Sequence, residues 1–273
     1  MQNNSYSVLM SLYYKENPQH LREALDSIFS QTVPSDDVVL VEDGIVGNAL
    51  DSVVCEYERL YPQLHVIRYE QNRGLGYALN DGIKECRHEI VARMDTDDVA
   101  KPYRMERQLT VLAEHPEYGM VSSWVAEFVD DIEHVTSERR LPELPEDVYE
   151  YAKKRCPINH PAVMYRKSCV LDVDGYQTKY FPEDYFLWIK MLMNGCKVYN
   201  IQESLVWFRY NPDTFARRGG WRYACDEVVT QWNIYRMGFI SFLRFCVNVI
   251  IRFSVRVVPN SIRLKFYTLF LRG

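Results

Sequence analysis

The stretch EIVARMDTDDVAKPYRMERQL, residues 89–109, places three aspartates directly after a short apolar run. The apolar residues 90–92 are typical of a buried strand, and the basic, amphipathic residues at the end of the stretch predict a helix. Asp95, Asp97 and Asp98 repel one another at this strand end unless something positive lies among them. The stretch therefore predicts a site that binds a positively charged group.

Strand and helix patterns alternate around this stretch. We expect strands at residues 7–12, 38–41, 64–69 and 89–94, and helices at residues 21–29, 50–60 and 75–86. This order predicts an α/β fold with a mostly parallel, Rossmann-like sheet and helices on both faces. Ligands of such sheets bind at the carboxyl ends of the strands. Glu42 and Asp43 end the second strand, so we expect them at the same edge as the aspartates.

The pattern changes after about residue 120. We expect two short strands within 120–129, a proline-rich connection at 139–147, a helix at 147–154, a strand at 162–167 and a loop that enters a helix at 180–195. We interpret residues 1–120 as a nucleotide-binding half and residues 121–237 as an acceptor-binding half of one domain. Residues 238–273 form a separate tail.

The acidic groups have two interpretations each. Asp97 or Asp98 would cap the following helix, or the cluster would bind Mg²⁺ or Mn²⁺ through its hard oxygens. The acids on the neighbouring strand favour the metal site. Glu183 and Asp184 precede another amphipathic helix, so one is expected as its cap and the other as a general base.

Two further stretches keep their alternatives open. Residues 72–76, NRGLG, open a helix and suit either an anion or an ordinary tight turn. His160, between Asn159 and Pro161, suits a buried, hydrogen-bonded histidine as well as a ligand contact.

The charge distribution separates the tail from the body. The chain has 32 basic and 37 acidic residues, but residues 238–273 carry basic side chains and no acid. Ser241, Arg244, Asn248, Arg252 and Arg256 share one arc of a helix whose other positions are apolar. Arginines at mid-bilayer are costly, so we expect a helix that lies in the membrane interface; a helix that covers the core is the alternative. The seven scattered cysteines suit a reducing cytosol, and the N-terminus does not look like a secretory signal.

Seven segments occur in a characteristic order: SVLMSLYYKE (7–16), SIFSQT (27–32), VLVEDG (39–44), NRGLGYALNDGI (72–83), ARMDTDDVAKPYRMERQL (92–109), NHPAVMYRK (159–167) and PEDYFLWIKML (182–192). Together they resemble the family 2 inverting glycosyltransferases, which have the GT-A, or nucleotide-diphospho-sugar transferase, fold. The resemblance runs from about residue 5 to 218.

The resemblance implies roles for particular residues. The implied contacts to the donor nucleotide and sugar are Ser11, Tyr13, Glu16, Glu42, Asp43, Arg73, Asp95 and Asp97. Asp95 and Asp97, with Asp98 beside them, match the family's metal-binding DxD element and imply Mn²⁺ or Mg²⁺. Glu183 and Asp184 match the catalytic acids, of which the second is usually the base. Glu42 departs from the family, which often has Asp at this position.

The tail and the segment NPDTFARRGGWRY (211–223) resemble a bacterial subgroup that builds O-antigen, capsule or exopolysaccharide repeat units. This resemblance implies transfer of a hexose, Glc or Gal, from UDP to an N-acetylhexosamine linked through diphosphate to undecaprenol. Arg217, Arg218 and His160 are the implied acceptor contacts. We expect a β linkage, a peripheral location on the cytoplasmic face of the membrane and no nucleic-acid partner.

Two other protein classes fit the sequence less well. A nicotinamide-dependent oxidoreductase needs a glycine-rich turn after its first strand, and residues 13–16, YYKE, contain no glycine. A non-catalytic relative that binds sugar or membrane is expected to have lost Asp97 or Asp184, and both are present.

Overall fold

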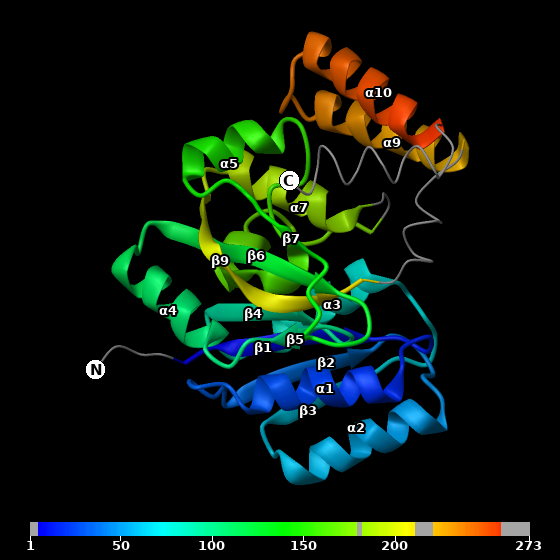
Figure 1. The fold of residues 1–273 in the computed structure, drawn as a ribbon, viewed down its shortest axis with the longest axis vertical. Coiled ribbons are helices and arrows are strands. Elements are labelled where there is room, and N and C mark those ends of the chain that lie inside the picture. Colours follow the sequence, from blue (N-terminus) through cyan, green and yellow to red (C-terminus); the bar gives the residue numbers. More distant parts are fainter. Residues whose placement is uncertain (1–4, 179–181, 211–220, 258–273) are drawn as a thin grey trace.

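The computed structural model describes residues 5–178, 182–210 and 221–257 (Figure 1). Its nine-stranded sheet has the order β3-β2-β1-β4-β8-β6-β9-β5, with β7 paired to β6. The strands are β1 (Ser7–Leu12), β2 (Asp37–Glu42), β3 (Leu64–Arg68), β4 (Ile90–Asp95), β5 (Val99–Ala100), β6 (Tyr118–Phe128), β7 (Ser137–Arg139), β8 (Met164–Arg166) and β9 (Lys197–Arg209). The helices are α1 (Pro18–Phe29), α2 (Asn48–Leu60), α3 (Leu75–Glu85), α4 (Arg104–Glu114), α5 (Pro145–Ala152), α6 (Lys167–Leu171), α7 (Glu183–Met193), α9 (Trp221–Arg236) and α10 (Phe242–Val257), with a short 3₁₀ turn at His160–Ala162.

The first four strands are parallel, as predicted. β1 pairs with β2 on one side and with β4 on the other, so Leu12 lies opposite Glu42 and Ser11 lies opposite Asp95. The acidic ends of β2 and β4 therefore reach the same edge of the sheet. This confirms the α/β fold and places the expected donor residues together.

Side chains of β1 alternate between two hydrophobic clusters. Val8, Met10 and Leu12 join the cluster that includes residues of α1, α2 and α4. Leu9 joins the cluster that includes residues of α3, α5 and α7. Gly82 lets α3 approach the sheet closely, because a Cβ there would lie 2.4 Å from Leu9 Cδ1. The sheet is therefore covered on both faces, as the apolar runs predict.

The prediction of two short strands within 120–129 is wrong. β6 is one strand of 11 residues, and it pairs in parallel with β9. The pairing of β6 with β9 shifts register around Ser123 and Trp124. Ser122 and Ser123 are both buried at this place. These serines interrupt the apolar pattern without interrupting the strand, because the irregular register accommodates them.

The C-terminal helix packs against the protein with its polar arc. Asn248 on α10 is buried and donates hydrogen bonds to Gln231 Oε1 on α9 (2.8 Å) and to the carbonyl of Lys153 (2.9 Å). Arg252 pairs with Glu227 at 2.5 Å. These two residues of the polar arc therefore lie between α10 and the rest of the protein. Among the described helices, none is long and apolar enough to span a membrane.

Candidate active site

A buried arginine lies among the aspartates at the end of β4. Arg93 is 2% exposed, and its guanidinium donates to both oxygens of Asp95, with 2.5 Å between Nη1 and Oδ2. Residues two apart on a strand point to the same side, so the spacing of Arg93 and Asp95 is a signal for this pair that the sequence predictions did not use. The Arg93 guanidinium therefore supplies part of the positive charge that the aspartates require.

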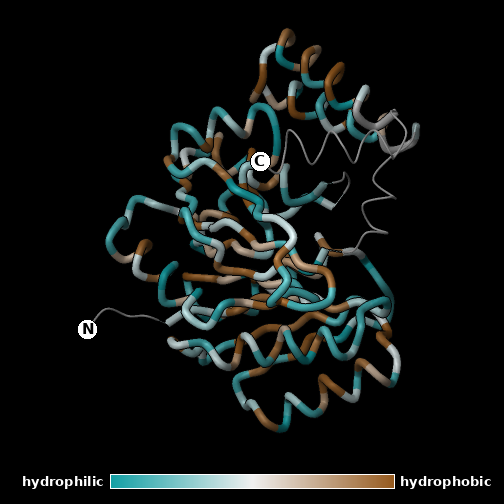
Figure 2. The backbone as a smooth tube through the Cα atoms, viewed as in Figure 1, coloured by the Kyte–Doolittle hydropathy of each residue, from teal (hydrophilic) through white to brown (hydrophobic). Residues whose placement is uncertain are grey.

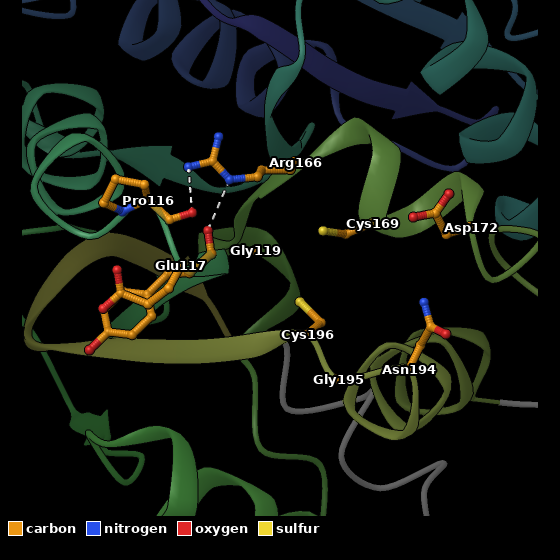
Figure 3. A pocket seen from close by; sticks show the side chains of 10 residues that line it. Pro116, Glu117, Gly119, Arg166, Cys169, Asp172, Asn194, Gly195 and Cys196 are labelled. Carbon is orange, nitrogen blue, oxygen red and sulfur yellow. Dashed lines mark hydrogen bonds between the residues drawn. The ribbon is translucent and has the colours of Figure 1, made fainter.

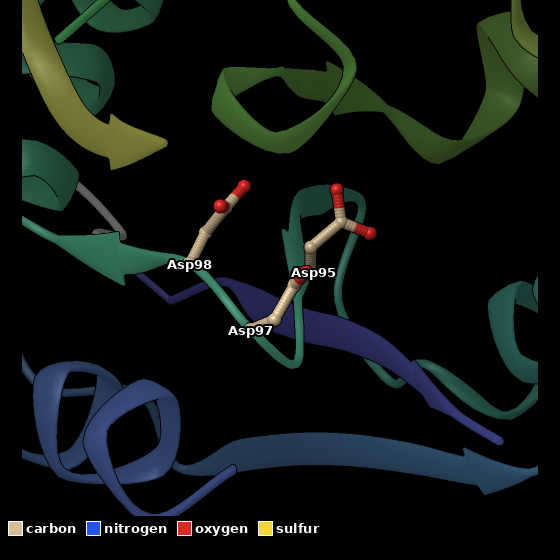
Figure 4. A group of neighbouring side chains, drawn as sticks. All are labelled: Asp95, Asp97 and Asp98. Atoms are coloured by element: carbon tan, nitrogen blue, oxygen red, sulfur yellow. The ribbon is translucent and has the colours of Figure 1, made fainter. Parts of the chain in front are cut away.

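Arg93 does not neutralise the whole cluster. One carboxylate oxygen from each of Asp95, Asp97 and Asp98 lies within 4.8 Å of the other two. Asp95 ends β4, and Asp97 and Asp98 follow it on the segment that leads to β5 (Figure 4). Burial and the charge of Asp95 raise the pKa of Asp97 to about 6. Burial and the two neighbouring aspartates raise the pKa of Asp98 well above its ordinary value. Glu16, from the loop after β1, has its pKa raised to about 8 by burial and then by Asp97 and Asp95.

The cluster fits a hard divalent cation. Mg²⁺ and Mn²⁺ prefer oxygen ligands, and the cluster supplies carboxylates that repel one another without added positive charge. Asp98 Oδ1 accepts a hydrogen bond from the backbone N–H of Arg209 at 2.7 Å, and its buried Oδ2 has no hydrogen-bond partner within the described ranges. Asp95 is already held by Arg93. Asp97 and Asp98 therefore retain more unused ligand capacity than Asp95.

The helix-capping interpretation of these acids is wrong. Tyr103 occupies the N-cap position of α4, and β5 separates that helix from Asp98. Pro182 occupies the N-cap position of α7, and Glu183 and Asp184 lie in its first turn. Neither acidic group supplies the N-cap residue, although Asp184 accepts a hydrogen bond from a first-turn N–H of α7, that of Tyr185. Both groups remain candidates for binding or catalysis.

Asp43 supplies the anion at the start of α3. Its Oδ1 accepts from the N–H of Arg73 at 2.6 Å, and its Oδ2 accepts from the N–H of Gly74 and from Asn72 Nδ2, each at 2.9 Å. Gly44 has φ +93°, and a Cβ there would lie 2.6 Å from the backbone nitrogen of Asn72. Residues 72–76, for which the sequence allowed either an anion or an ordinary tight turn, thus bind a carboxylate of the chain itself, which fixes this loop beside the sheet edge.

The other expected donor residues border the same edge. The carbonyl of Ser11 accepts from Thr96 Oγ1 at 3.2 Å, and Tyr13 is exposed in the loop after β1. Glu42 is buried, its Oε2 lies 3.5 Å from Arg68 Nε, and burial raises its pKa. Their contacts to a donor stay predictions.

The side chain of Arg73 is engaged on α3. Its guanidinium lies 4.8 Å from the ring centroids of both Tyr69 and Tyr77, and its Nη1 lies 3.0 Å from Asp81 Oδ2. A contact to the donor requires Arg73 to leave these partners, and that contact also stays a prediction.

The charges at the end of β4 also act on Glu183 and Asp184. Burial raises the pKa of both Glu183 and Asp184; the charge of Asp95 adds to this effect, and that of Arg93 opposes it. Asp184 Oδ1 accepts from the backbone N–H of Tyr185 at 2.7 Å. The first turn of α7 therefore lies near the end of β4, although 87 residues separate their sequence positions.

His160 is held by a tyrosine. Its Nε2 lies 3.0 Å from the hydroxyl of Tyr176, and its ring packs against Trp188. Burial, with the charge of Arg93, keeps the pKa of His160 well below its ordinary value. This is the hydrogen-bonded histidine that the sequence allowed, close to the site. Arg217 and Arg218 lie outside the described residues.

A pocket with a volume of about 250 Å³ lies at the opposite edge of the sheet. Side chains from the start of β6, from α6 and from the end of α7 line it (Figure 3). Cys169 and Cys196 both point into this region, and each sulfur lies less than 3 Å from the place where a Cβ on Gly119 would be. Because β6 begins beside the amino end of β4, the pocket is separate from the acidic cluster.

Comparisons with known proteins agree with this arrangement. Residues 7–170 match the family model described as Glycosyl transferase family 2. The chain is 39% identical to the Escherichia coli UDP-Gal:alpha-D-GlcNAc-diphosphoundecaprenol beta-1,3-galactosyltransferase, over 98% of this chain and 96% of that protein. It is 36% identical to the amylovoran biosynthesis glycosyltransferase AmsE of Erwinia amylovora, over 96% and 97% of the two chains.

Solved structures share the fold at low sequence identity. The S. aureus TarS fragment 1-349 in complex with UDP-GlcNAc has a TM-score of 0.66 and 17% identity, over 98% of this chain and 76% of that one. The mannosyltransferase PcManGT from Pyrobaculum calidifontis, in complex with GDP-Man and Mn²⁺, has a TM-score of 0.64 and 19% identity, over 89% and 67% of the two chains. These structures support the GT-A fold. The chain belongs to glycosyltransferase family 2 and is a glycosyltransferase.

Proposed function

We propose that this enzyme transfers galactose from UDP-galactose to an N-acetylglucosamine linked through diphosphate to a polyprenol, and that it forms a β linkage. The observation that carries this proposal is the 39% identity, over nearly the full length of both chains, to the E. coli galactosyltransferase of that specificity. Transfer of glucose is the second candidate, because the sequence resemblance left the hexose open. The product belongs to a surface polysaccharide repeat unit, in line with the relative from amylovoran biosynthesis.

The donor is proposed to bind at the carboxyl ends of β1, β2 and β4. Ser11, Glu42 and Asp43 border the place for the nucleoside, as the family resemblance implies. Asp97, with Asp95 and Asp98, would hold Mn²⁺ or Mg²⁺ beside the donor diphosphate. When bound, such an ion supplies positive charge that stabilises the departing nucleoside diphosphate.

Asp184 is proposed as the general base. Burial raises its pKa, which brings its basicity closer to that needed to take a proton from a hydroxyl at neutral pH. The N–H of Tyr185 fixes Oδ1 of Asp184, and among the described residues Oδ2 accepts only a long contact from Cys156 Sγ at 4.0 Å. Oδ2 is therefore the oxygen proposed to take the proton of the acceptor hydroxyl. One displacement by that hydroxyl on an α-linked donor inverts the anomeric carbon and gives the β product. Glu183 is proposed to support this site.

The acceptor is proposed to reach the enzyme from the cytoplasmic face of the membrane, with the enzyme bound peripherally. His160 is proposed to contact the acceptor sugar, and its ring packs against Trp188 on α7, the helix whose first turn carries Asp184. Arg217 and Arg218 would donate to the acceptor diphosphate.

The experiment is a transfer assay with a water-soluble acceptor that carries N-acetylglucosamine, diphosphate and a short alkyl chain. We expect product from UDP-galactose, a β linkage in its NMR spectrum and loss of turnover in excess EDTA. Asp184→Asn should lower kcat by ~10²–10⁴ with little effect on UDP affinity, and Glu183→Gln should lower it less. An α-linked product, full turnover in EDTA, or failure to use any diphosphate-linked acceptor would contradict the proposal.

A further inference from the structure

The last two described helices form a hairpin that leaves an apolar face uncovered. α9 and α10 lie at one end of the long axis of the molecule, and α2 lies near the other end (Figure 1). Leu243 on α10 is 75% exposed, Ile250 is 66% exposed and Ile251 is 58% exposed; Phe242 and Val247 are also exposed. Their spacing of three to four residues places them along one side of the helix, and Figure 2 shows hydrophobic positions recurring along it.

This orientation is fixed by the polar side of the helix. Asn248 bonds to Gln231 and to the carbonyl of Lys153, while Arg252 pairs with Glu227 and donates to the carbonyl of Lys154 at 2.8 Å. Burying the apolar side against the protein requires α10 to roll and break these contacts. Glu227 is buried, so loss of the Arg252 guanidinium beside it would be costly. The apolar side is therefore held outward.

Aromatic side chains gather where the two helices meet at the turn. The rings of Trp232 and Tyr235 on α9 and of Phe242 and Phe245 on α10 form contacts with centroid separations of 5.5 to 6.0 Å. Trp232 and Phe242 are exposed within this group. Trp and Tyr are enriched at the boundary between lipid and water, since their rings are apolar and carry one polar group.

The charge of residues 238–273 favours an anionic lipid surface over a second copy of the chain as the partner. No acidic residue occurs between Gly238 and Gly273, and six basic residues do. Arg252 is paired with Glu227, so the other five are the charges that a partner would meet. A second copy of the chain docked through the same face would bring these like charges together, which opposes association. An anionic lipid surface attracts them, at about 1 kcal/mol for each basic residue near the surface.

We propose that α10 lies parallel to an anionic membrane and inserts the side formed by Phe242, Leu243, Val247, Ile250 and Ile251 into the interface. The polar side of the helix, with Asn248 and Arg252, binds the enzyme body instead of the lipid headgroups. This inference rests on the proposed function, because a polyprenol-linked acceptor would lie in the same leaflet. It assigns membrane contact to the apolar side of one helix and gives the enzyme a fixed orientation at the surface.

The test is flotation of the full chain with vesicles of phosphatidylcholine alone or with phosphatidylglycerol. We expect binding to the anionic vesicles and at least tenfold weaker partitioning of Ile250→Glu and of Leu243→Glu. Leu60→Glu on α2, at a side chain that is 61% exposed, is the matched control and should change partitioning less than twofold. Circular dichroism checks that each variant is folded.

Two results would overturn the inference. One is unchanged vesicle binding by Ile250→Glu and Leu243→Glu. The other is a concentration-dependent dimer of the wild-type chain in sedimentation velocity that Ile250→Glu dissociates, since this would make a second copy the occupant. Transfer to the short-chain acceptor in solution is measured in parallel. Vesicle binding through α10 without any transfer would refute the proposed function alone, and transfer without α10-dependent binding would refute this inference alone.

Discussion

Replacement of Asp97 by asparagine should stabilise the metal-free protein while it removes activity. The pKa of Asp97 rises from 3.8 to about 6 in the folded chain because of burial and the charge of Asp95. A difference of this size between folded and unfolded states corresponds to ~3 kcal/mol when the carboxyl is fully ionised. Asp97 is only partly buried, so solvent screening reduces the expected gain to ~1–2 kcal/mol.

The pH dependence has a defined sign. Because the folded-state pKa of Asp97 is higher than the unfolded one, the folded protein binds more protons. The stability that protonated Asp97 contributes is fully present below pH ~4 and is lost as the pH rises through about 6. Asp97→Asn does not undergo this loss. The variant should therefore exceed the wild type in stability at pH 7.5, and most of the difference should disappear at pH 4.5.

The assay is denaturant unfolding in EDTA at both pH values, repeated at pH 7.5 with Mn²⁺. Mn²⁺ should stabilise the wild type by mass action and Asp97→Asn much less. Asp172→Asn, an exposed aspartate on the far side of the sheet, is the control and should behave as the wild type does. Lower stability of Asp97→Asn than of the wild type in EDTA at pH 7.5, or an equal gain at both pH values, would refute this electrostatic account of the cluster.

Three further predictions concern single contacts. Arg93→Gln leaves the charge of Asp95 without its buried partner and should cost ~3–5 kcal/mol in denaturant unfolding, with partial recovery when Asp95→Asn is added; equal stability of Arg93→Gln and the wild type would contradict this. Gly119→Ala places a Cβ 2.6 Å from the sulfur of Cys196 and should cost ~1–3 kcal/mol, part of which Cys196→Ala should restore; an unchanged melting temperature of the single variant would count against it. Glu16 has a pKa of about 8, so cation binding should release its proton and strengthen between pH 6.5 and 8.5; Glu16→Gln should flatten that slope in a Mg²⁺ titration, and parallel slopes would exclude the coupling.

The alternation of strands and helices in the first half of the chain and the edge that carries the site were predictable from the sequence, because both follow from local patterns. Continuous apolar runs with helical stripes between them specify parallel strands, and parallel strands bring Glu42 and Asp95 to one edge. Two parts of the site depended on long-range contacts that no local pattern specifies. Asp43 holds a loop 30 residues away, and Arg209 reaches Asp98 across 111 residues.

The tail shows a different limit of sequence patterns. An amphipathic stripe identifies two sides of α10 but does not say which side contacts the protein. Contacts with α9 determine the orientation of α10, because Glu227 pairs with Arg252 and Gln231 accepts a hydrogen bond from Asn248. A polar arc therefore became the packed side, which is the reverse of the usual arrangement in a globular protein.

Arg93 and the proposed divalent cation would have different roles at the end of β4. Arg93 is buried, and its guanidinium fixes Asp95 with no donor bound. It leaves Asp97, Asp98 and Glu16 with raised pKa values, so the edge still lacks positive charge at neutral pH. A nucleoside diphosphate is itself anionic, and its approach to this edge would increase the repulsion. A fixed arginine at every carboxylate would remove the repulsion but leave no oxygens for a cation. Incomplete neutralisation therefore supports the proposal that donor binding depends on a divalent ion, whose charge would offset the repulsion between the acidic edge and a diphosphate.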